Sequence, residues 1–230
     1  MALALNSRFV GNVFILQCKG RIAMGEEVKA LQAALDRGAH EFIRIVLNMS
    51  EVDRLDSTGI GLLVRYAANL RKRGGDIRLA APPQFIVTLL KLANLSSYLH
   101  VDTTEEDAIV SFLKRNPHQK TAENRGPSVL ILDQSADLCA FVRTVLAQHG
   151  FDVKTTCSIR DAKILLKVDQ VDYILVGAGT PHLSAETAVA TLQALAPKAA
   201  AYHLGADFHC RDAHEATESL LKLFGPNGPM

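Results

Sequence analysis

An apolar strand followed by a short turn and a helix occupies residues 42–73, and this run constrains the fold more than any other stretch. Residues 42–48, FIRIVLN, have the composition of a buried strand. The acidic turn VDRLD follows at 52–56, and a helix is predicted from about Ser57 to Arg73. A strand leading directly into a helix of this length is typical of α/β folds, in which helices cover a sheet.

The first turn of this predicted helix has an unusual composition. Ser57 and Thr58 stand where the helix begins, and Ser or Thr oxygens often accept hydrogen bonds from unpaired N–H groups there. Gly59 and Gly61 each lower helix propensity by about 1 kcal/mol relative to Ala, so we expect something to approach this backbone closely. The simplest interpretation is a capped helix packed against its sheet. The alternative is a modification site, since a phosphate is tolerated at a helix N-terminus.

Further strands and helices are predicted around this run. Residues 2–19 form two strands joined at Gly11-Asn12, and a helix follows from Glu26 to Arg37, with Gly38 as its C-cap. After the central helix we expect a strand at DIRLA (76–80), a helix after Pro82-Pro83, an edge strand at YLHV (98–101) and a last helix ending near Arg115.

The second half of the chain repeats the alternation of strand and helix. Residues 116–127 are polar and hold two prolines, so we predict a domain at 1–116, a linker at 117–127 and a second domain at 128–225. In the second domain, strands at 128–132, 151–155 and 171–179 alternate with helices at 136–148 and 159–167. Such alternation predicts a parallel sheet with right-handed crossovers, as in flavodoxin-like folds.

Composition narrows the class of protein. The chain has 230 residues, 48% of them hydrophobic and 21% charged, with a formal net charge of +1, so nothing indicates nucleic-acid binding by bulk charge. Its four cysteines show no CxxC pairing, which favours reduced thiols in a cytosol. No apolar run reaches the roughly 18 residues needed to span a bilayer, and no signal peptide is evident at the N-terminus. We therefore expect a cytoplasmic protein without a membrane association.

Residues 3–115 resemble the STAS domain, the fold of bacterial anti-sigma factor antagonists, which has a mixed β-sheet with helices. The motif DSTGIG (56–61) matches the Asp-Ser-x-Gly-(Leu/Ile)-Gly signature, and Gly20, LRKRGGDIRLA (70–80) and LLKLANLSSYLHV (89–101) follow the family pattern. The resemblance implies that Ser57 is phosphorylated by a partner kinase that is also the anti-sigma factor. It also implies a partner-binding surface at Asp56, Ser57, Thr58, Gly59, Ile60 and Gly61. One departure is Gly20-Arg21-Ile22-Ala23, which lacks the acid of the family's Gly-x-Leu-Asp.

Residues 128–224 resemble the receiver domain of response regulators, with VLILDQS (129–135) and DYILVGAGTP (172–181) as the matching strands. A receiver needs a phosphoacceptor aspartate four residues before the proline of that second segment, and that position is Gly177 here. Asp133 remains at the end of the first strand, but Gln134 stands where a second acid would hold magnesium. We therefore expect a pseudo-receiver that accepts no phosphoryl group and serves for binding.

Other candidate sites have plainer interpretations. The cluster His203, His209, Cys210, Asp212 and His214 matches no closed zinc motif, so surface or loop residues are expected and no metal or cofactor is predicted. Asp53 and Asp56 are expected to be turn and capping acids rather than a general acid–base pair. The basic trio Arg71-Lys72-Arg73 is expected to be a solvated helix end rather than a nucleic-acid patch.

Three hypotheses for function follow. The first is a non-enzymatic signalling protein that binds an anti-sigma factor with serine kinase activity and is switched by phosphorylation of Ser57, with the second half as a further docking face or homodimer contact. The second is a constitutive scaffold or small-ligand-binding STAS module in which Ser57 is only a helix cap. The third is an enzyme that uses the crevice at the carboxyl ends of the second sheet, for which no nucleophile–base pair is found.

Overall fold

The computed structural model describes residues 2–114, 126–178, 184–204, 218–220, 222 and 224. The chain divides into two compact units, Met1–Arg115 and Asn116–Met230. Most of the predicted linker lies outside the described residues, so the domain limits given above stay predictions. Both units have the predicted α/β class.

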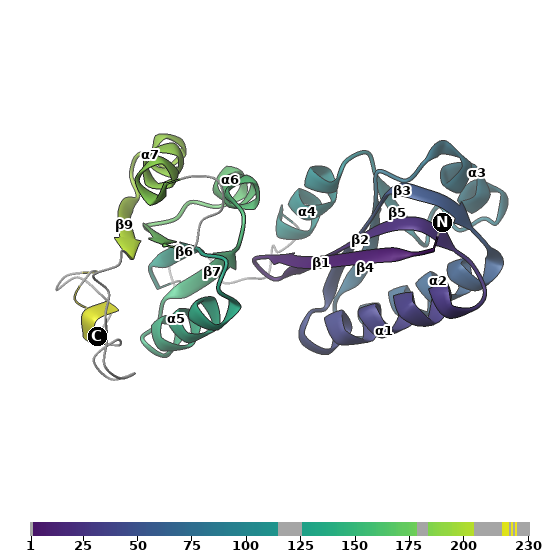
Figure 1. Ribbon diagram of the computed structural model, residues 1–230, viewed down its shortest axis with the longest axis horizontal. Coiled ribbons are helices and arrows are strands. Elements are labelled where there is room, and N and C mark those ends of the chain that lie inside the picture. Colours follow the sequence, from purple (N-terminus) through teal and green to yellow (C-terminus); the bar gives the residue numbers. More distant parts are fainter. Residues whose placement is uncertain are drawn as a thin grey trace. The chain divides into compact units, whose positions relative to one another are not determined.

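The first unit has a five-stranded mixed sheet. The strands are β1 (Ala4–Val10), β2 (Val13–Ile22), β3 (Arg44–Leu55), β4 (Asp76–Ala80) and β5 (His100–Asp102), in the order β5-β4-β3-β2-β1. β1 is antiparallel to β2, and the other neighbours are parallel. The helices are α1 (Glu26–Glu41), α2 (Ser57–Lys72), α3 (Gln84–Leu92) and α4 (Glu105–Lys114). α1 and α2 cover one face of the sheet and α4 the other (Figure 1).

The main core of this unit lies between the sheet and α1 and α2. Leu31 and Leu35 of α1 and Leu63 and Leu70 of α2 are almost completely buried against Leu47 of β3. Burial of such side chains contributes about 1.5–3 kcal/mol each. The N-terminus of α2 is thereby fixed at the end of β3.

β3 is longer than the sequence predicts. The expected strand ends at Asn48 and is followed by an acidic turn, but β3 continues to Leu55. The extension pairs with β2 in parallel register, with Gly20 opposite Val52 and Ile22 opposite Leu55. Because this pairing buries Val52 and Leu55, long-range strand pairing overrides the local polarity of the segment.

The predicted C-cap at Gly38 is wrong, because α1 continues to Glu41 and is capped by Phe42. A Cβ built on Gly38 would lie 2.5 Å from Cδ1 of Phe14 in β2. The Phe14 ring also stacks on Phe42, with 5.8 Å between the ring centroids. Gly38 therefore allows the helix to pack closely on the sheet, and it does not end the helix.

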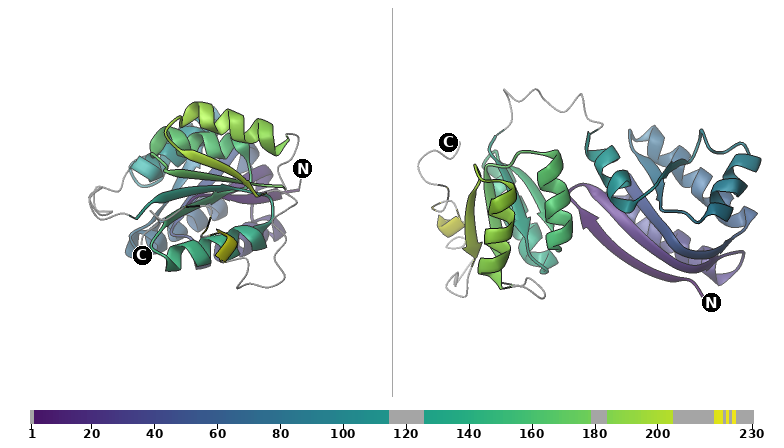
Figure 2. Two further views of the ribbon diagram at one scale, coloured as in Figure 1. Left: turned by 90° about the vertical axis from the view of Figure 1, so that its left-hand side faces the viewer. Right: turned by 90° about the horizontal axis from the view of Figure 1, so that it is seen from above.

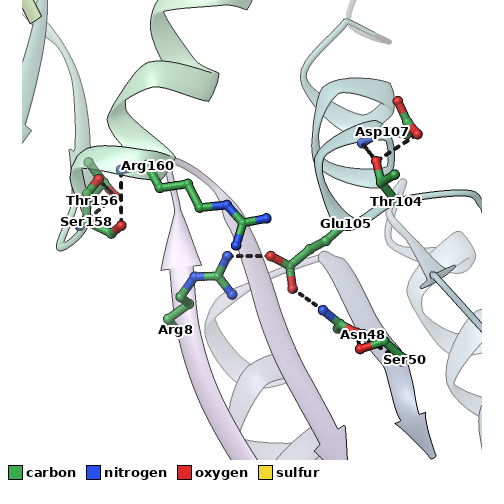
Figure 3. Close-up of polar contacts among 9 residues, drawn as sticks. All are labelled: Arg8, Asn48, Ser50, Thr104, Glu105, Asp107, Thr156, Ser158 and Arg160. Atoms are coloured by element: carbon green, nitrogen blue, oxygen red, sulfur yellow. Dashed lines mark hydrogen bonds and ion pairs between the residues drawn. The ribbon is translucent and has the colours of Figure 1, made fainter.

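Buried polar contacts hold α4 to the opposite face of the sheet. Glu105, which is almost fully buried, accepts hydrogen bonds of 2.7 Å from Arg8 Nη2 and from Asn48 Nδ2 (Figure 3). In the neighbouring strands, Arg78 donates to both oxygens of Asp102 at 2.6 and 2.7 Å. This face is therefore fixed by ion pairs as well as by apolar contacts.

The second unit has a parallel sheet. Its strands are β6 (Ser128–Leu132), β7 (Asp152–Thr156), β8 (Tyr173–Gly177) and β9 (Ala200–Leu204), in the order β7-β6-β8-β9. α5 (Ala136–Gln148) covers one face, and α6 (Ile159–Val168) and α7 (Ala185–Leu195) cover the other (Figures 1 and 2). The strand order 2-1-3-4 with helices on both faces is that of flavodoxin-like, doubly wound sheets.

Among the helices that the structure describes, none combines the length and the apolar character needed to cross a bilayer.

Candidate functional site

The N-cap of α2 is Asp56, so the predicted capping role of Ser57 and Thr58 is wrong. Asp56 has extended backbone angles, and its Oδ1 accepts hydrogen bonds of 2.9 Å from both Thr58 N and Gly59 N. Ser57 is already the first helical residue, so its side chain does not face the unpaired N–H groups in the way that an N-cap does. The capping expectation for Asp56 itself is confirmed.

The Asp56 carboxylate also holds the loop between β2 and α1. Its second oxygen, Oδ2, accepts a 2.7 Å hydrogen bond from Met24 N. The backbone N–H of Asp56 donates to the carbonyl of Ile22 at 3.1 Å. The hydrogen bonds from Gly59 and Met24, followed by that from Thr58, hold the pKa of Asp56 below its usual value, and the charge of Arg54 adds to this effect. The ionised Asp56 carboxylate therefore links the start of α2 to the loop between β2 and α1.

Ser57 and Thr58 lie on the surface. Both residues are exposed, and the Ser57 hydroxyl makes no hydrogen bond within the described part of the chain. The hydroxyl is thus accessible to an enzyme from outside. It stands at a helix N-terminus, where added negative charge is tolerated by the helix itself.

The two glycines of the motif have different roles. A Cβ at Gly59 would lie 2.8 Å from both Ile22 Cγ2 and Leu55 Cδ1, so Gly59 is required for packing against β2 and β3. A Cβ at Gly61 would have no atom within 4 Å. The close approach expected at these glycines is therefore made at Gly59 by side chains of the domain itself. Of the two glycines, Gly61 is the one whose backbone another molecule can approach.

Met24 completes the surface around Ser57. Its side chain is 77% exposed, and the next residue, Gly25, has a φ of 128°, which favours glycine. We use the name Ser57 surface for the predicted residues without the buried Gly59 and with Met24 added, namely Met24, Asp56, Ser57, Thr58, Ile60 and Gly61. Sequence reasoning missed Met24, because no local pattern indicates that residue 24 lies beside residue 56.

The position of the family's missing acid is Ala23 in this chain, and the nearby Arg21 makes a contact of its own. Arg21, in the departing segment 20–23, forms a 2.6 Å ion pair with Glu27 at the start of α1. The hydrogen bond from Arg21 holds the pKa of Glu27 below its usual value. An ion pair therefore joins the end of β2 to the start of α1, and position 23 itself carries no carboxylate.

Asp53 and Asp56 do not act as a pair. Asp53 is exposed within β3 and does not lie in a turn, whereas Asp56 is engaged by three backbone N–H groups. A carboxylate that accepts several hydrogen bonds is stabilised as an anion and is a poor proton donor. The arrangement does not favour general acid–base catalysis by these two residues.

In the second unit, Asp133 and Gly177 are brought together at the carboxyl ends of β6 and β8. Asp133 is only 4% exposed, and its Oδ1 accepts a 2.6 Å hydrogen bond from Ser135 N. A Cβ built on Gly177 would lie 2.6 Å from Cγ of Asp133. The Asp133 carboxylate therefore lies in the space that a larger residue at position 177 would occupy.

The remaining candidates are placed as follows. Of the basic trio expected as a solvated helix end, Lys72 and Arg73 are exposed. Arg71 is half-buried, with a 3.0 Å ion pair to Asp76 and its guanidinium 4.5 Å from the Tyr98 ring centroid. His203 is exposed in β9, and the predicted cluster members His209, Cys210, Asp212 and His214 lie outside the described residues. Within the described ranges, no three His, Cys, Asp or Glu side chains gather as metal ligands would.

A family comparison agrees with this geometry. Residues 4–108 match the model of the STAS domain. The first unit of the chain is therefore a STAS domain, as the motif DSTGIG predicts. The receiver-like character of the second unit stays a prediction. No curated protein sequence matches the chain.

Solved structures of similar fold are also found. One is the anti-sigma factor antagonist SpoIIAA in its unphosphorylated form, at 20% identity over 47% of this chain and 95% of that chain, with a TM-score of 0.42. The Bacillus cell fate determinant SpoIIAA in the phosphorylated form has 20% identity over 46% and 96%, with a TM-score of 0.39. An anti-sigma factor antagonist from Mycobacterium paratuberculosis has 21% identity over 48% and 94%, with a TM-score of 0.43.

Proposed function

We propose that this chain is a non-enzymatic signalling protein of the anti-sigma factor antagonist type. Its STAS domain binds an anti-sigma factor that is also a serine kinase, and phosphorylation of Ser57 controls the binding. The match of residues 4–108 to the STAS family supports the class of partner. The observation that carries the switch is the exposed Ser57 hydroxyl, free of intramolecular hydrogen bonds within the described residues.

The phosphorylation step needs a nucleoside triphosphate bound to the partner kinase. The Ser57 oxygen forms a bond to the γ-phosphorus, the bond from that phosphorus to the β-phosphate oxygen breaks, and the nucleoside diphosphate leaves. The hydroxyl proton passes to a base of the kinase. This chain contributes only the acceptor oxygen.

The charge of the phosphate drives the release of the partner. Phosphoserine adds about −1.5 to −2 charges at neutral pH. These charges stand next to Asp56, which is already anionic, on a surface that in this proposal binds the partner while the Ser57 side chain is uncharged. A loss of about 3 kcal/mol of binding free energy lowers the affinity by roughly 100-fold, so no change of fold is needed.

The second unit is proposed to be a pseudo-receiver that supplies a second docking face or a homodimer contact. Support comes from the parallel strand order β7-β6-β8-β9 and from Gly177 at the position of a phosphoacceptor. Magnesium prefers several hard oxygen ligands, and the loop after β6 offers Asp133 followed by Gln134.

The alternative function, a constitutive scaffold or small-ligand-binding module, assigned Ser57 only the role of a cap. Asp56 takes that role in the structure, so the alternative leaves the exposed Ser57 without a structural task. It remains the second candidate for the STAS domain, with partner binding that is independent of the charge at residue 57.

The test compares the wild-type 230-residue chain with two variants, Ser57→Asp and Ser57→Asn. The Asp and Asn side chains have nearly the same shape and differ in charge. The partner is first recovered from the source cell with the wild-type chain and purified, and its affinity for each form is measured by calorimetry. We expect about 100-fold weaker binding for Ser57→Asp and nearly unchanged binding for Ser57→Asn. Equal affinity for all three forms, with no phosphoryl group on Ser57 in protein from the native cell, would favour the alternative.

A further inference from the structure

One carboxylate joins the start of α2 to the loop that precedes α1. Oδ1 of Asp56 caps the helix through Thr58 N and Gly59 N, and Oδ2 accepts the hydrogen bond from Met24 N at 2.7 Å. The first two bonds are local, whereas the third joins residues 32 positions apart in the sequence. Asp56 therefore fixes a loop that the helix itself does not hold.

The fixed loop presents an apolar side chain to solvent. Gly25 has a φ of 128°, and its carbonyl accepts only a long hydrogen bond of 3.3 Å from Lys29 N as α1 begins. Met24 is 77% exposed, although its backbone N–H is held by Asp56. An exposed methionine on a fixed backbone is suited to contact a partner, because its side chain adapts to irregular apolar surfaces.

We propose that Asp56 couples the charge state of Ser57 to the position of Met24, so that phosphorylation of Ser57 breaks the Asp56–Met24 hydrogen bond and releases residues 23–25. This inference rests on the proposed function in one respect, namely that Ser57 is the residue phosphorylated. Release of the loop then weakens partner binding further, in addition to the charge repulsion, because the partner no longer contacts Met24 in its fixed position.

Two physical effects drive the coupling. The phosphate repels the Asp56 carboxylate on the adjacent residue, because two anions lie close together. Phosphate oxygens also compete for N–H groups in the first turn of the helix, which are good anion ligands. This competition weakens the hold of Thr58 N and Gly59 N on Oδ1, so the carboxylate is free to move away from the phosphate, and Met24 N in its loop then loses its acceptor Oδ2.

The experiment uses nuclear magnetic resonance on the 230-residue chain without any partner. The forms compared are wild type, wild type with phosphoserine incorporated at residue 57, Ser57→Asp and Ser57→Asn. We expect the Met24 amide to exchange about tenfold faster in the phosphoserine and Ser57→Asp forms, with an upfield shift of its proton. The Ser57→Asn form keeps the wild-type values, and the amide of Leu63 inside α2 is the internal reference.

Asp56→Asn gives a second, independent readout. Asparagine keeps an oxygen for the helix cap but replaces the other acceptor with an NH2 group, which cannot accept from Met24 N. We expect the Met24 amide to exchange as fast in Asp56→Asn as in the phosphoserine form, with no further increase when both changes are combined.

The outcomes separate this inference from the proposed function. Unchanged Met24 exchange in the phosphoserine form would overturn the coupling, even if phosphorylation abolishes partner binding. Faster Met24 exchange, together with an affinity for the partner that is the same in wild type and Ser57→Asp, would support the coupling and overturn the proposed switch.

Discussion

The carboxylate of Asp133 fills the space that a side chain at Gly177 would need. A Cβ built on Gly177 would lie 2.6 Å from Cγ and 2.9 Å from Cβ of Asp133, distances that real Cβ atoms do not have. The two residues end neighbouring parallel strands, β6 and β8. The acid of one strand thus excludes a larger residue from the end of the other.

Gly177→Asp should therefore fail to create a phosphoacceptor. The new side chain clashes with Asp133 and adds a second carboxylate, so we expect a loss of about 2–4 kcal/mol in unfolding free energy. Urea unfolding measures the loss, and labelling with acetyl phosphate tests phosphoryl transfer. Gly177→Ala is the matched control, which should lose stability through the clash alone. Efficient labelling of a stable Gly177→Asp protein would contradict this view of the site.

Asp56→Ala should cost about 1 kcal/mol of unfolding free energy at neutral pH, since it removes the N-cap of α2. The pKa of Asp56 is lower in the folded state than in the unfolded state, because backbone N–H groups stabilise the anion. The stabilisation is therefore complete above the unfolded pKa, about 3.9, and is lost as the pH falls through the lower folded value. Urea unfolding of wild type and Asp56→Ala is compared between about pH 3 and about pH 7, a range that includes the unfolded pKa of about 3.9. The difference in unfolding free energy between the two proteins should shrink only at the acidic end of this range.

In this comparison Asp56→Asn is the control, because it keeps a cap but does not titrate. A difference between wild type and Asp56→Ala that stays constant down to the acidic end of the series would refute the assigned role of the carboxylate.

Alanine at the two glycines of the motif should have opposite effects. Gly59→Ala places a methyl group 2.8 Å from Ile22 Cγ2 and Leu55 Cδ1, so we expect a loss of about 1–3 kcal/mol. Gly61→Ala faces open space and gains helix propensity, which should stabilise the protein by up to about 1 kcal/mol. Thermal unfolding of the two variants tests the pair, and equal melting temperatures would show that the packing at Gly59 is looser than described.

Removing one partner of the Arg78–Asp102 ion pair should destabilise the protein strongly, whereas replacing both partners with apolar residues should destabilise it less. Their side chains are 9% and 8% exposed, and the Arg78 guanidinium lies 5.7 Å from the ring centroid of Phe112 in α4. Asp102→Ala leaves a buried cation without its partner and should cost about 3–5 kcal/mol. The double variant Arg78→Met/Asp102→Leu should cost clearly less than Asp102→Ala in urea unfolding. A double variant as unstable as the single one would argue for a role beyond mutual neutralisation.

Local patterns were sufficient to predict most of the helices and strands. The start of α2 at Ser57, the strand DIRLA and the alternation of elements over 128–168 follow from the spacing of apolar residues, which depends on the period of each element. The errors lie where distant segments meet. β3 extends to Leu55 because β2 pairs with it, and Gly38 lies inside α1 because Phe14 packs against it.

The sequence by itself determined the α/β class of the fold and the STAS motif that contains Ser57, because both depend on residues close together along the chain. Only the tertiary structure decided that the Asp56 carboxylate also holds Met24, that Gly59 packs against β2 and β3 while Gly61 is open, and that Asp133 fills the space beside Gly177. These relationships join segments far apart in sequence, and the packing of the sheet places them together. The spacing of residues along one element carries no information about which distant residue it will meet.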